Sequence, residues 1–280
     1  MPREVARSAA ASLSRASASA ARGLRTDPPE PRDVIAVDNG GVMDLALASE
    51  KDPSVAAKPF FKIGRGHYTK LATLFGRFGG CRHKKGSPQH AACLNAHVLA
   101  LLARYDALGG HGYQAALPGR AFDVLLECLG TNAECFASPL NCRYERFCSA
   151  FPDVDTPFGS WGSFFSPSFT PTKGSFEANP PFVPEVMLAM VEKMDALLAA
   201  TNEPLSFVII VPAWTEIPAW KALTSSKFRQ AEVVIVPKQD HSFCDGAQHQ
   251  RRPTERFRPS SFDTGLFLLS NQPDGPASET

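Results

Sequence analysis

The sequence has no long hydrophobic run. Nowhere in its 280 residues do apolar side chains approach the ~18–20 in succession that a membrane-spanning helix needs. It also has almost no excess of either charge, with 29 Lys and Arg against 28 Asp and Glu. The first absence leads us to expect no membrane partner. The balanced charge means that the chain lacks the overall basic character of many nucleic-acid-binding proteins. A local basic surface is still compatible with the sequence, because the charges are unevenly distributed.

Cysteine pairs with metal-binding or redox spacing are also missing. The seven cysteines are an odd number, and none forms a Cys-x-x-Cys pair. Most lie among apolar residues, which is typical of buried free thiols in a reducing compartment. His241, Cys244 and His249 have a spacing that zinc sites sometimes show, but no fourth ligand is evident, so we expect no metal.

The chain has enough apolar residues, 44%, for one substantial domain with smaller additions. Its first 26 residues contain five arginines, one acid and many Ala and Ser, which is typical of an organellar transit peptide and equally of a disordered tail. We expect residues 1–58 to be such a tail followed by an extended or weakly ordered segment. Residues 273–280 are expected to form a second disordered tail.

Residues 59–130 have the pattern of a small helical, partly basic domain. Apolar spacing and good helix formers predict helices over 91–107 and 119–130, the second ending at Gly130. The basic side chains would suit phosphate groups of RNA, or simply a solvated surface. They are Lys62, Arg65, Lys70, Arg77, Arg82, Lys84 and Lys85.

Strand and helix patterns alternate from residue 131 to residue 272. Strands are predicted at 133–138, 174–178, 204–214, 231–237 and 264–271, and helices at 143–151 and 183–200. The last helix carries a single apolar stripe and has Pro184 in its first turn, where proline is tolerated. This alternation predicts an α/β fold with a parallel or mostly parallel sheet and helices on both faces.

The stretch GSFEANPPFVPE at 174–185 places two consecutive prolines between a strand and a helix. Because prolines lack a backbone N–H, Asn179–Phe182 fits neither element, and a stiff turn is the plainest interpretation. A donor-free loop at a strand end would also offer oxygens to both hydrogens of an exocyclic amine. Phe182 would add a stacking surface worth roughly 1–3 kcal/mol. Methyl transfer from a sulfonium to such an amine needs alignment and charge stabilisation, without an early general base.

The same region resembles a known family over several segments in chain order. They are AECFASPLNCRYERFCSAFPDVD at 133–155, FGS at 158–160, GSFEANPPF at 174–182 and EPLSFVIIVPAW at 203–214. These segments look like the methyltransferase core of the cap-specific adenosine N6-methyltransferases, the phosphorylated CTD-interacting factor family, over about residues 59–270. The resemblance implies a Rossmann-like, S-adenosylmethionine-dependent methyltransferase domain over 131–272, docked on a small helical substrate-binding domain over 59–130. It also implies N6-methylation of the 2′-O-methyladenosine next to the 7-methylguanosine cap of mRNA.

The resemblance further implies roles for individual residues. The catalytic loop would be Asn179, Pro180, Pro181 and Phe182, which would contact both the amine and the methyl donor. The cofactor would be held by Phe136, Ala137, Ser138, Pro139 and Asn141 with Asn179 and Phe182. Asp153 and Asp155 would hydrogen-bond its ribose or, alternatively, stabilise a loop turn. The substrate would meet Arg65, Glu185, Trp214, Glu216, Pro218 and His241, where the Trp214 indole would suit the charged 7-methylguanine.

Some features depart from the family. Ala213 and Pro184 stand where we expect acids, and residues 136–141 lack a glycine-rich pattern. N6-methylation of adenine in uncapped RNA or DNA, or a catalytically silent cap- or RNA-binding role, therefore stays open beside methylation of 7-methylguanosine-capped RNA. Animal members carry a WW module that binds the RNA polymerase tail. The three tryptophans here all lie in the methyltransferase region, so we expect no such contact.

The sequence allows two interpretations each of the cellular location, the Phe-rich loop and a second basic set. Organellar transcripts usually lack the cap, so we expect the nucleus, with import through an N-terminal transit peptide as the alternative. The Phe-rich loop at 158–169 would serve as a lid or, more simply, as a buried plug. Lys227, Arg229 and the arginines between 251 and 258 form a second basic set, again suited to phosphate or to plain solvation.

Overall fold

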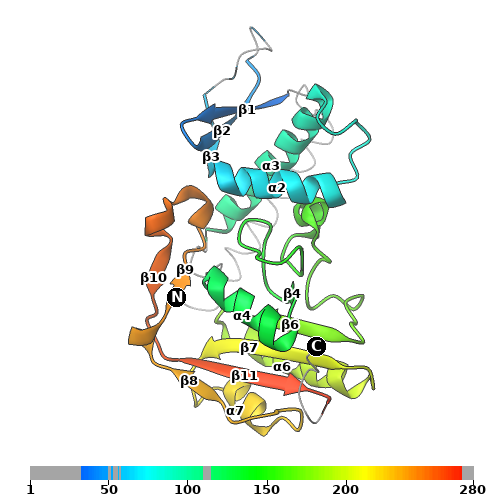
Figure 1. The fold of residues 1–280 in the computed structure, drawn as a ribbon, viewed down its shortest axis with the longest axis vertical. Helices are drawn as coiled ribbons and strands as arrows, with labels where there is room; N and C mark the ends of the chain where they lie inside the picture. Colours follow the sequence, from blue (N-terminus) through cyan, green and yellow to red (C-terminus); the bar gives the residue numbers. More distant parts are fainter. Residues whose placement is uncertain (1–32, 50–51, 53–55, 57, 110–114, 273–280) are drawn as a thin grey trace, which may run out of the picture.

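The computed structural model describes residues 33–49, 52, 56, 58–109 and 115–272. Residues 1–32 and 273–280, where the sequence predicts a targeting-like or disordered tail and a second tail, lie outside the described residues. Figure 1 shows a unit of two helices and a small sheet at one end of the long axis and a larger, helix-covered sheet at the other. Three strands come first in the chain, two of them unpredicted, and the helices and the α/β alternation then follow in the predicted order.

The first unit combines an antiparallel sheet with two helices. Its elements are β1 (Val34–Asn39), β2 (Val42–Leu47), β3 (Phe61–Gly64), α2 (Arg65–Phe78) and α3 (Pro88–Leu108). The sequence predicts only an extended or weakly ordered segment before residue 58, yet β1 and β2 form a hairpin around Gly40 and Gly41, both with positive φ. The hairpin packs into the unit, because Leu45 and Ile63 are fully buried in the same apolar cluster as α2 and α3.

The larger sheet has six strands in the order β5-β4-β6-β7-β11-β8. Its strands are β4 (Ala133–Glu134), β5 (Arg146–Phe147), β6 (Gly174–Ala178), β7 (Leu205–Pro212), β8 (Val234–Val236) and β11 (Thr264–Ser270). The first four in the sheet are parallel, but β11 runs antiparallel to both β7 and β8. The sheet is therefore mixed, because the last strand returns between β7 and β8 in the opposite direction.

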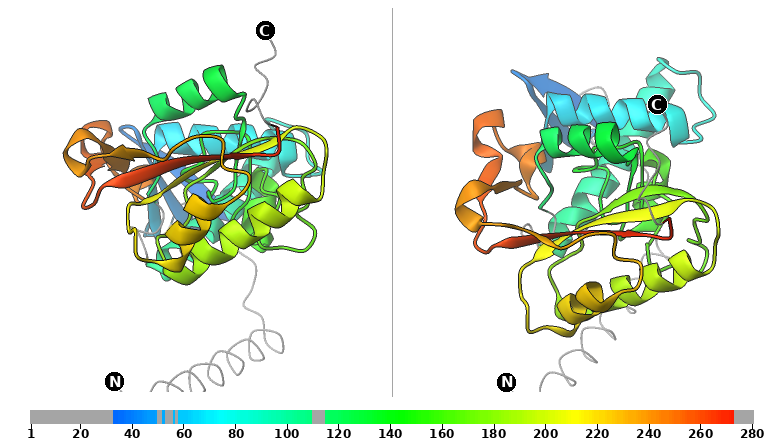
Figure 2. Two further views of the ribbon diagram at one scale, coloured as in Figure 1. Left: turned by 90° about the horizontal axis from the view of Figure 1, so that it is seen from below. Right: turned by 60° about the horizontal axis from the view of Figure 1, so that its bottom comes forward.

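Helices cover both faces of this sheet, as the sequence predicts, and Figure 2 shows it between them. The helices α6 (Pro184–Ala199) and α7 (Pro218–Ser225) lie on one face, and α4 (Gly119–Leu129) lies on the other. Alternate residues of the strands explain this: Phe207 and Ile209 pack in the cluster with α6, whereas Val208 and Ile210 pack with side chains of α4. The central strand β7 is thus buried on both sides.

The helix predicted over 143–151 is wrong. Those residues form β5 and turns, followed by the single-turn α5 (Pro152–Asp155) and the 3₁₀ turn η2 (Thr156–Phe158). The Glu134 carboxylate accepts the backbone N–H groups of Arg143 and Tyr144 at 2.7 and 2.8 Å, and the Glu134 carbonyl accepts the Cys148 N–H at 2.8 Å. These N–H groups are therefore satisfied across strands rather than along a helix.

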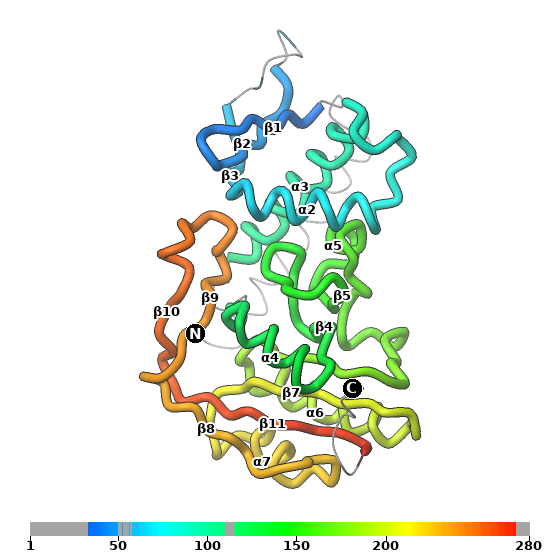
Figure 3. Tube along the Cα trace, viewed as in Figure 1, coloured from blue at the N-terminus to red at the C-terminus, as the bar shows by residue number. Residues whose placement is uncertain are grey.

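A two-stranded antiparallel arm extends from the β8–β11 edge of the sheet. It contains β9 (Ser242–Cys244) and β10 (Phe257–Pro259), and the 3₁₀ turns near it are η3 (Lys238–Asp240), η4 (Gln248–Gln250) and η5 (Pro253–Glu255). Figure 3 shows this β9–β10 arm, residues 242–259, rising beside the sheet towards β3 and α2. The His249 ring lies 6.5 Å from the ring of His67 in α2, so the arm links the two units.

The strand order locates the expected binding crevice. The chain leaves β4 for β5 on one side and later returns to β6 on the other side of β4, so the order reverses between β4 and β6. In open α/β sheets, ligands bind beyond the carboxyl ends of strands at such a reversal. The loops that follow these two strands begin at Cys135 and at Asn179.

Candidate active site

A cavity of about 680 Å³ opens where the strand order reverses, and we call it the switch-point cavity. The loops after β4, β5 and β6 all contribute to its wall, together with the end of α3 and the Phe-rich loop. From these elements come Phe136, Ala137, Ser138, Asn141, Ser149, Ala150, Ser163, Phe164, Phe165, Asn179, Pro181 and Tyr105. Its size suits a nucleoside-sized ligand.

A second cavity of about 380 Å³ adjoins the first, and we call it the aromatic cavity. Phe182 lies between two other rings of its lining, with ring centroids 5.3 Å from Phe262 and 6.0 Å from Phe243. The Trp214 ring packs edge-on against Phe262 at 5.8 Å. A cavity lined by this many rings suits a flat aromatic group such as a nucleobase.

The loop after β6 is the wall between the two cavities. Asn179, Pro181 and Ala115 line both, whereas Pro180 and Phe182 line only the aromatic cavity. A group bound on one side would therefore meet a ring bound on the other across this loop. The loop is closed by short backbone hydrogen bonds, since the Val183 N–H donates to the Pro181 carbonyl at 2.7 Å before α6 begins.

Asn179 has a buried acceptor without a partner. Its side chain is fixed because Nδ2 donates to the Ala115 carbonyl at 3.0 Å. The residue is 9% exposed, and Oδ1 has no hydrogen-bond partner among the described residues. An unpaired buried acceptor costs about 1–3 kcal/mol. A ligand N–H that reached Oδ1 would recover that free energy.

The loop after β4 presents polar groups beside an aromatic wall. Asn141 Oδ1 accepts from the Ser138 backbone N–H at 2.7 Å and from its hydroxyl at 3.0 Å, which fixes the turn. The Phe136 ring lies 5.0 Å from Phe164 and 5.8 Å from Phe165, between centroids. Rings on one side with hydroxyl and amide groups on the other fit the base and sugar of S-adenosylmethionine.

Of the two candidate acids after β5, only Asp155 hydrogen-bonds a residue that lines this cavity. Asp153 is at the surface, where both its oxygens bind Arg104 at 3.1 and 2.6 Å, and this contact lowers the pKa of Asp153. Asp155 is buried and accepts the Tyr105 hydroxyl at 2.8 Å. Burial raises the pKa of Asp155 to about 6. Tyr105 lines the switch-point cavity, so Asp155 supports that wall from behind.

The predicted cofactor and substrate residues divide into two groups. Phe136, Ala137, Ser138 and Asn141 line the switch-point cavity and Trp214 lines the aromatic cavity, as the resemblance implies, while Pro139 is buried outside the cavity lining. The other predicted substrate residues line neither cavity. Arg65 forms an ion pair with Asp38 at 2.6 Å, and Glu216 forms one with Lys221 at 3.5 Å. Glu185 and Pro218 are exposed in the first turns of α6 and α7, and His241 Nε2 lies 2.9 Å from the Thr264 hydroxyl.

Sequence reasoning missed several lining residues. Ser149 and Ala150 follow β5, and the wrong helix over 143–151 concealed their place at a strand end. Phe243 and Phe262 come from the β9–β10 arm and the loop after it, where the sequence points only to basic residues and not to these rings. The Phe-rich loop turns out to be both plug and wall, because Phe164 is buried whereas Phe165 is 40% exposed at the cavity.

Two buried carboxyls lie in the strands that lead into the site. Glu134 of β4 and Glu177 of β6 are partners in the strand register and are 2% and 1% exposed. Burial raises the pKa of both, and that of Glu177 lies well above its usual value. Two adjacent carboxylates in such surroundings cannot both be ionised at low cost, so the pair holds a proton at neutral pH.

A basic cavity of about 440 Å³ lies between α2, α4 and the β9–β10 arm. Lys70, Arg143 and Arg256 line it, and its lining contains no Asp or Glu. Lys70 Nζ donates to the carbonyls of Leu140 and Cys142 at 3.3 and 3.1 Å, so it also secures the loop after β4. This cavity meets the switch-point cavity at Asn141.

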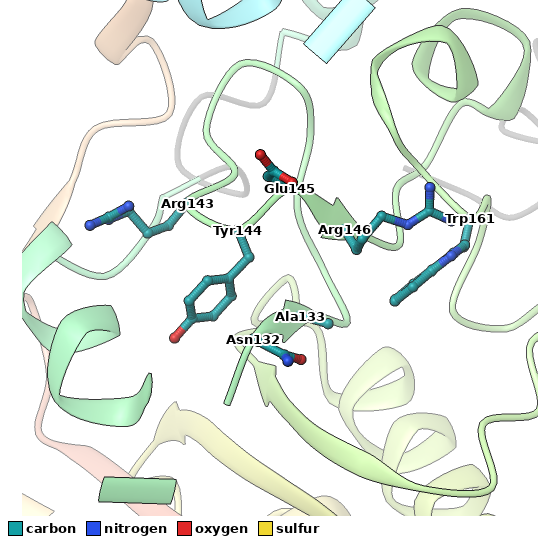
Figure 4. A pocket seen from close by; sticks show the side chains of 7 residues that line it. All are labelled: Asn132, Ala133, Arg143, Tyr144, Glu145, Arg146 and Trp161. Atoms are coloured by element: carbon teal, nitrogen blue, oxygen red, sulfur yellow. The ribbon is translucent and has the colours of Figure 1, made fainter. Parts of the chain in front are cut away.

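Another cavity, of about 480 Å³, lies at the amino ends of β4 and β5, away from Asn179. Figure 4 shows Arg146 and Trp161 at one end of it and Arg143 and Tyr144 at the other. The Arg146 guanidinium lies 4.7 Å from the centroid of the Trp161 ring. Ligand sites of α/β sheets are found at the other end of the strands, so we do not include this cavity in the site.

The part of the chain that the structure describes contains no group of three or more His, Cys, Asp or Glu able to hold a metal ion. Within the same residues, no helix combines the length and apolar character that crossing a membrane requires.

Comparisons with known proteins identify relatives of this chain. The chain is 37% identical over 220 residues to the mRNA (2′-O-methyladenosine-N6-)-methyltransferase of Mus musculus and 36% identical over 220 residues to that of Homo sapiens. Each alignment covers 76% of this chain and 30% of the relative, so the chain spans about a third of the length of these curated relatives. Among solved structures, a candidate RNA methyltransferase of Pyrococcus horikoshii is 11% identical, with a TM-score of 0.29, over 72% of this chain and 97% of that one.

A family model described as the phosphorylated CTD interacting factor 1 WW domain matches residues 70–246. That range is well over half of the 280-residue chain and contains its three tryptophans. The matched range extends from α2 to the β9–β10 arm and includes all the residues that line the switch-point cavity. Together with the relatives, this match confirms the resemblance that the motifs between 133 and 214 indicate. The chain belongs to the phosphorylated CTD interacting factor 1 family.

Proposed function

We propose that this protein transfers a methyl group from S-adenosylmethionine to N6 of the 2′-O-methyladenosine beside the 7-methylguanosine cap of mRNA. The observation that carries the proposal is Asn179, whose buried Oδ1 is without a partner in the wall shared by the two cavities. The mouse and human relatives carry the name of that activity. Because this chain spans only 30% of their length, the substrate is a proposal for this chain.

The switch-point cavity would hold S-adenosylmethionine, which supplies an electrophilic methyl group when bound. Phe136 and Phe165 would pack against its adenine, and Ser138 and Ser149 would bind its hydroxyl and amino acid groups. The reversal of strand order between β4 and β6 supports a Rossmann-like methyltransferase domain. We propose residues 131–272 as this domain, with α4 covering one face of its sheet and the unit that contains α2 and α3 as its substrate-binding partner.

The loop Asn179–Phe182 would orient the acceptor amine. Asn179 Oδ1 would accept one N6 hydrogen and the Pro180 carbonyl the other, which aims the nitrogen lone pair across the wall. Phe182 and Phe262 would hold the adenine ring in the aromatic cavity. The same two oxygens stabilise the positive charge that develops on nitrogen during transfer, and their positions are set before the reaction.

Trp214 lines the aromatic cavity and would stack on a base of the substrate, the charged 7-methylguanine being the better partner for an indole. This preference for a cationic base supports the capped substrate over an uncapped one. A capped mRNA substrate also leads us to propose the nucleus as the location.

Mass spectrometry of RNA incubated with the protein and S-adenosylmethionine tests the function. The substrates are identical short RNAs that begin with 2′-O-methyladenosine, one with the 7-methylguanosine cap and one with a 5′ triphosphate. We expect methylation of the capped RNA alone. Equal methylation of both would replace the proposal by general adenine methylation. No methylation, together with failure of S-adenosylhomocysteine to bind, would favour a catalytically silent cap- or RNA-binding protein.

A further inference from the structure

The β9–β10 arm delivers arginines to three cavities in series. Arg258 lines the aromatic cavity, and with Arg251 it also lines a neighbouring cavity of about 280 Å³. Arg256 lines the basic cavity beyond. The first two cavities share Phe243 and Arg258, and the second and third share Cys244. The arginines thus follow one path that leads away from the aromatic cavity.

Asp245 holds the first of these arginines in place. Its carboxylate is 5% exposed, and it accepts the Ala247 N–H at 2.7 Å and the Nε–H of Arg258. Arg251 Nε lies 4.0 Å from the same carboxylate. The contact uses Nε of Arg258, and the Arg258 side chain stays 60% exposed. An arginine fixed in this way has little conformational freedom left to lose when it binds an anion.

The far end of the path is basic, and of its cations Arg143 pairs with Asp123 at 2.6 Å. The basic cavity has Lys70, Arg143 and Arg256 in its lining and no carboxylate. Arg256 makes one long contact, from Nε to the Arg251 carbonyl at 3.4 Å, and no carboxylate of the described residues pairs with it. The N-terminus of α4 adds partial positive charge, because Gly119, its first residue, also lines this cavity.

We propose that Arg258, Arg251 and Arg256 form a track that binds the phosphates joined to the nucleoside in the aromatic cavity. The proposal rests on the proposed function, since it is the acceptor base that fixes where the track begins. Guanidinium groups suit phosphate because they offer several donors in one plane. An aromatic cavity at the start of a cationic path matches the alternation of base and phosphate in a nucleic acid.

Binding measurements over a series of salt concentrations test the track in the full chain. The probe is a fluorescein-labelled short RNA beginning with adenosine, and S-adenosylhomocysteine is present so that no methyl transfer occurs. Loss of one phosphate contact should lower the slope of log affinity against log salt by about 0.7 and weaken binding at every salt concentration. We expect this of Arg256→Gln and of Arg258→Gln. Arg252→Gln is the matched control, because Arg252 is exposed and lines none of these cavities.

Two further comparisons sharpen the result. Arg258→Gln removes the Arg258 side of the ion pair with buried Asp245 and so could lower stability. Arg258→Lys keeps a cation there, and the melting temperature shows whether either variant is destabilised. Arg256→Gln breaks no ion pair of the described residues. Repeating the titration with an RNA whose 5′ end is a hydroxyl, without 5′ phosphates, shows which phosphates are bound. If the difference in salt slope between variant and wild type disappears, the track binds phosphates on the 5′ side of the adenosine. If the difference persists, the track binds phosphates on its 3′ side.

The outcomes separate the track from the proposed function. Wild-type salt slopes in both Arg256→Gln and Arg258→Lys would overturn the track, even if the capped RNA is methylated. A lowered slope in Arg256→Gln, in a protein that methylates no adenosine, would support the track and overturn the function.

Discussion

Asn179 donates a hydrogen bond from its side-chain Nδ2 to the backbone carbonyl of Ala115, at 3.0 Å and across 64 positions of sequence. Both residues line the switch-point cavity and the aromatic cavity. The bond engages one of the two Nδ2 hydrogens and thereby fixes which way the acceptor of the amide, Oδ1, points. The segment that precedes α4 thus helps to orient the group on which the proposed chemistry depends.

Asn179→Ala should abolish most methyl transfer. The substitution removes the acceptor for one amine hydrogen, and losing a single preorganised group of this kind typically lowers kcat by about 100- to 1,000-fold. The melting temperature should change little, because the side chain sits in a loop between β6 and α6. Steady-state kinetics with saturating capped RNA give kcat.

Asn132→Ala is the matched control for this variant. Asn132 lies at the amino end of β4, in the cavity shown in Figure 4, and is exposed. It should keep the wild-type kcat. Full activity in Asn179→Ala would remove the proposed role of the loop.

The position of this loop was predictable because its signal is local. Two prolines after an apolar strand end that strand whatever surrounds them, and the stripe and first-turn proline of α6 mark the start of the next helix. The β1–β2 hairpin also has a local signal, since Asn39-Gly40-Gly41 between apolar runs is typical of a tight hairpin turn.

Other features depend on contacts between distant segments. Residues 143–151 have a helical pattern, but the buried carboxylate of Glu134 takes their first N–H groups. The apolar sequence of β11 does not indicate that this strand is antiparallel, because parallel and antiparallel buried strands look alike in sequence. The aromatic cavity depends on Phe243 and Phe262, which the β9–β10 arm and the loop after it bring back to Phe182.

Phe165→Ala should weaken binding of S-adenosylhomocysteine roughly tenfold, which corresponds to about 1.4 kcal/mol. The ring lines the switch-point cavity and is 40% exposed, so truncation removes a stacking surface without opening the core. Isothermal titration calorimetry measures the affinity. Phe60→Ala, a change at a 60% exposed ring of the N-terminal unit, is the control and should bind like wild type. Equal affinities in all three proteins would exclude Phe165 from the cofactor site.

Glu177→Gln should stabilise the protein increasingly as pH rises. Burial raises the pKa of Glu177 above its usual 4.5, so the folded state holds a proton that the unfolded chain releases. Wild-type stability therefore falls as pH rises from about 4.5 through the raised pKa, by up to about 1.4 kcal/mol per pH unit. Glutamine has no proton to lose, and it cannot repel Glu134 beside it.

Melting temperatures at pH 5 and pH 8 measure this effect as a difference between variant and wild type. The comparison cancels groups of opposite sign, such as His67, whose pKa burial lowers to about 3. Glu192→Gln on the exposed side of α6 should shift the melting temperature equally at both pH values. A gap between Glu177→Gln and wild type that stays constant with pH would show that Glu177 is ionised in the folded protein.

Leu45→Ala tests whether the β1–β2 hairpin is part of the folded unit. Leu45 is fully buried in the cluster that holds Ile63 and Leu71, so the cavity left by truncation should cost about 2–5 kcal/mol of unfolding free energy. Val37→Ala in the partner strand removes a 45% exposed side chain and should change it by less than about 0.5 kcal/mol. Urea denaturation gives both values. If Leu45→Ala is as mild as Val37→Ala, the hairpin does not support the core, and the stretch before residue 58 is the weakly ordered segment that its composition predicts.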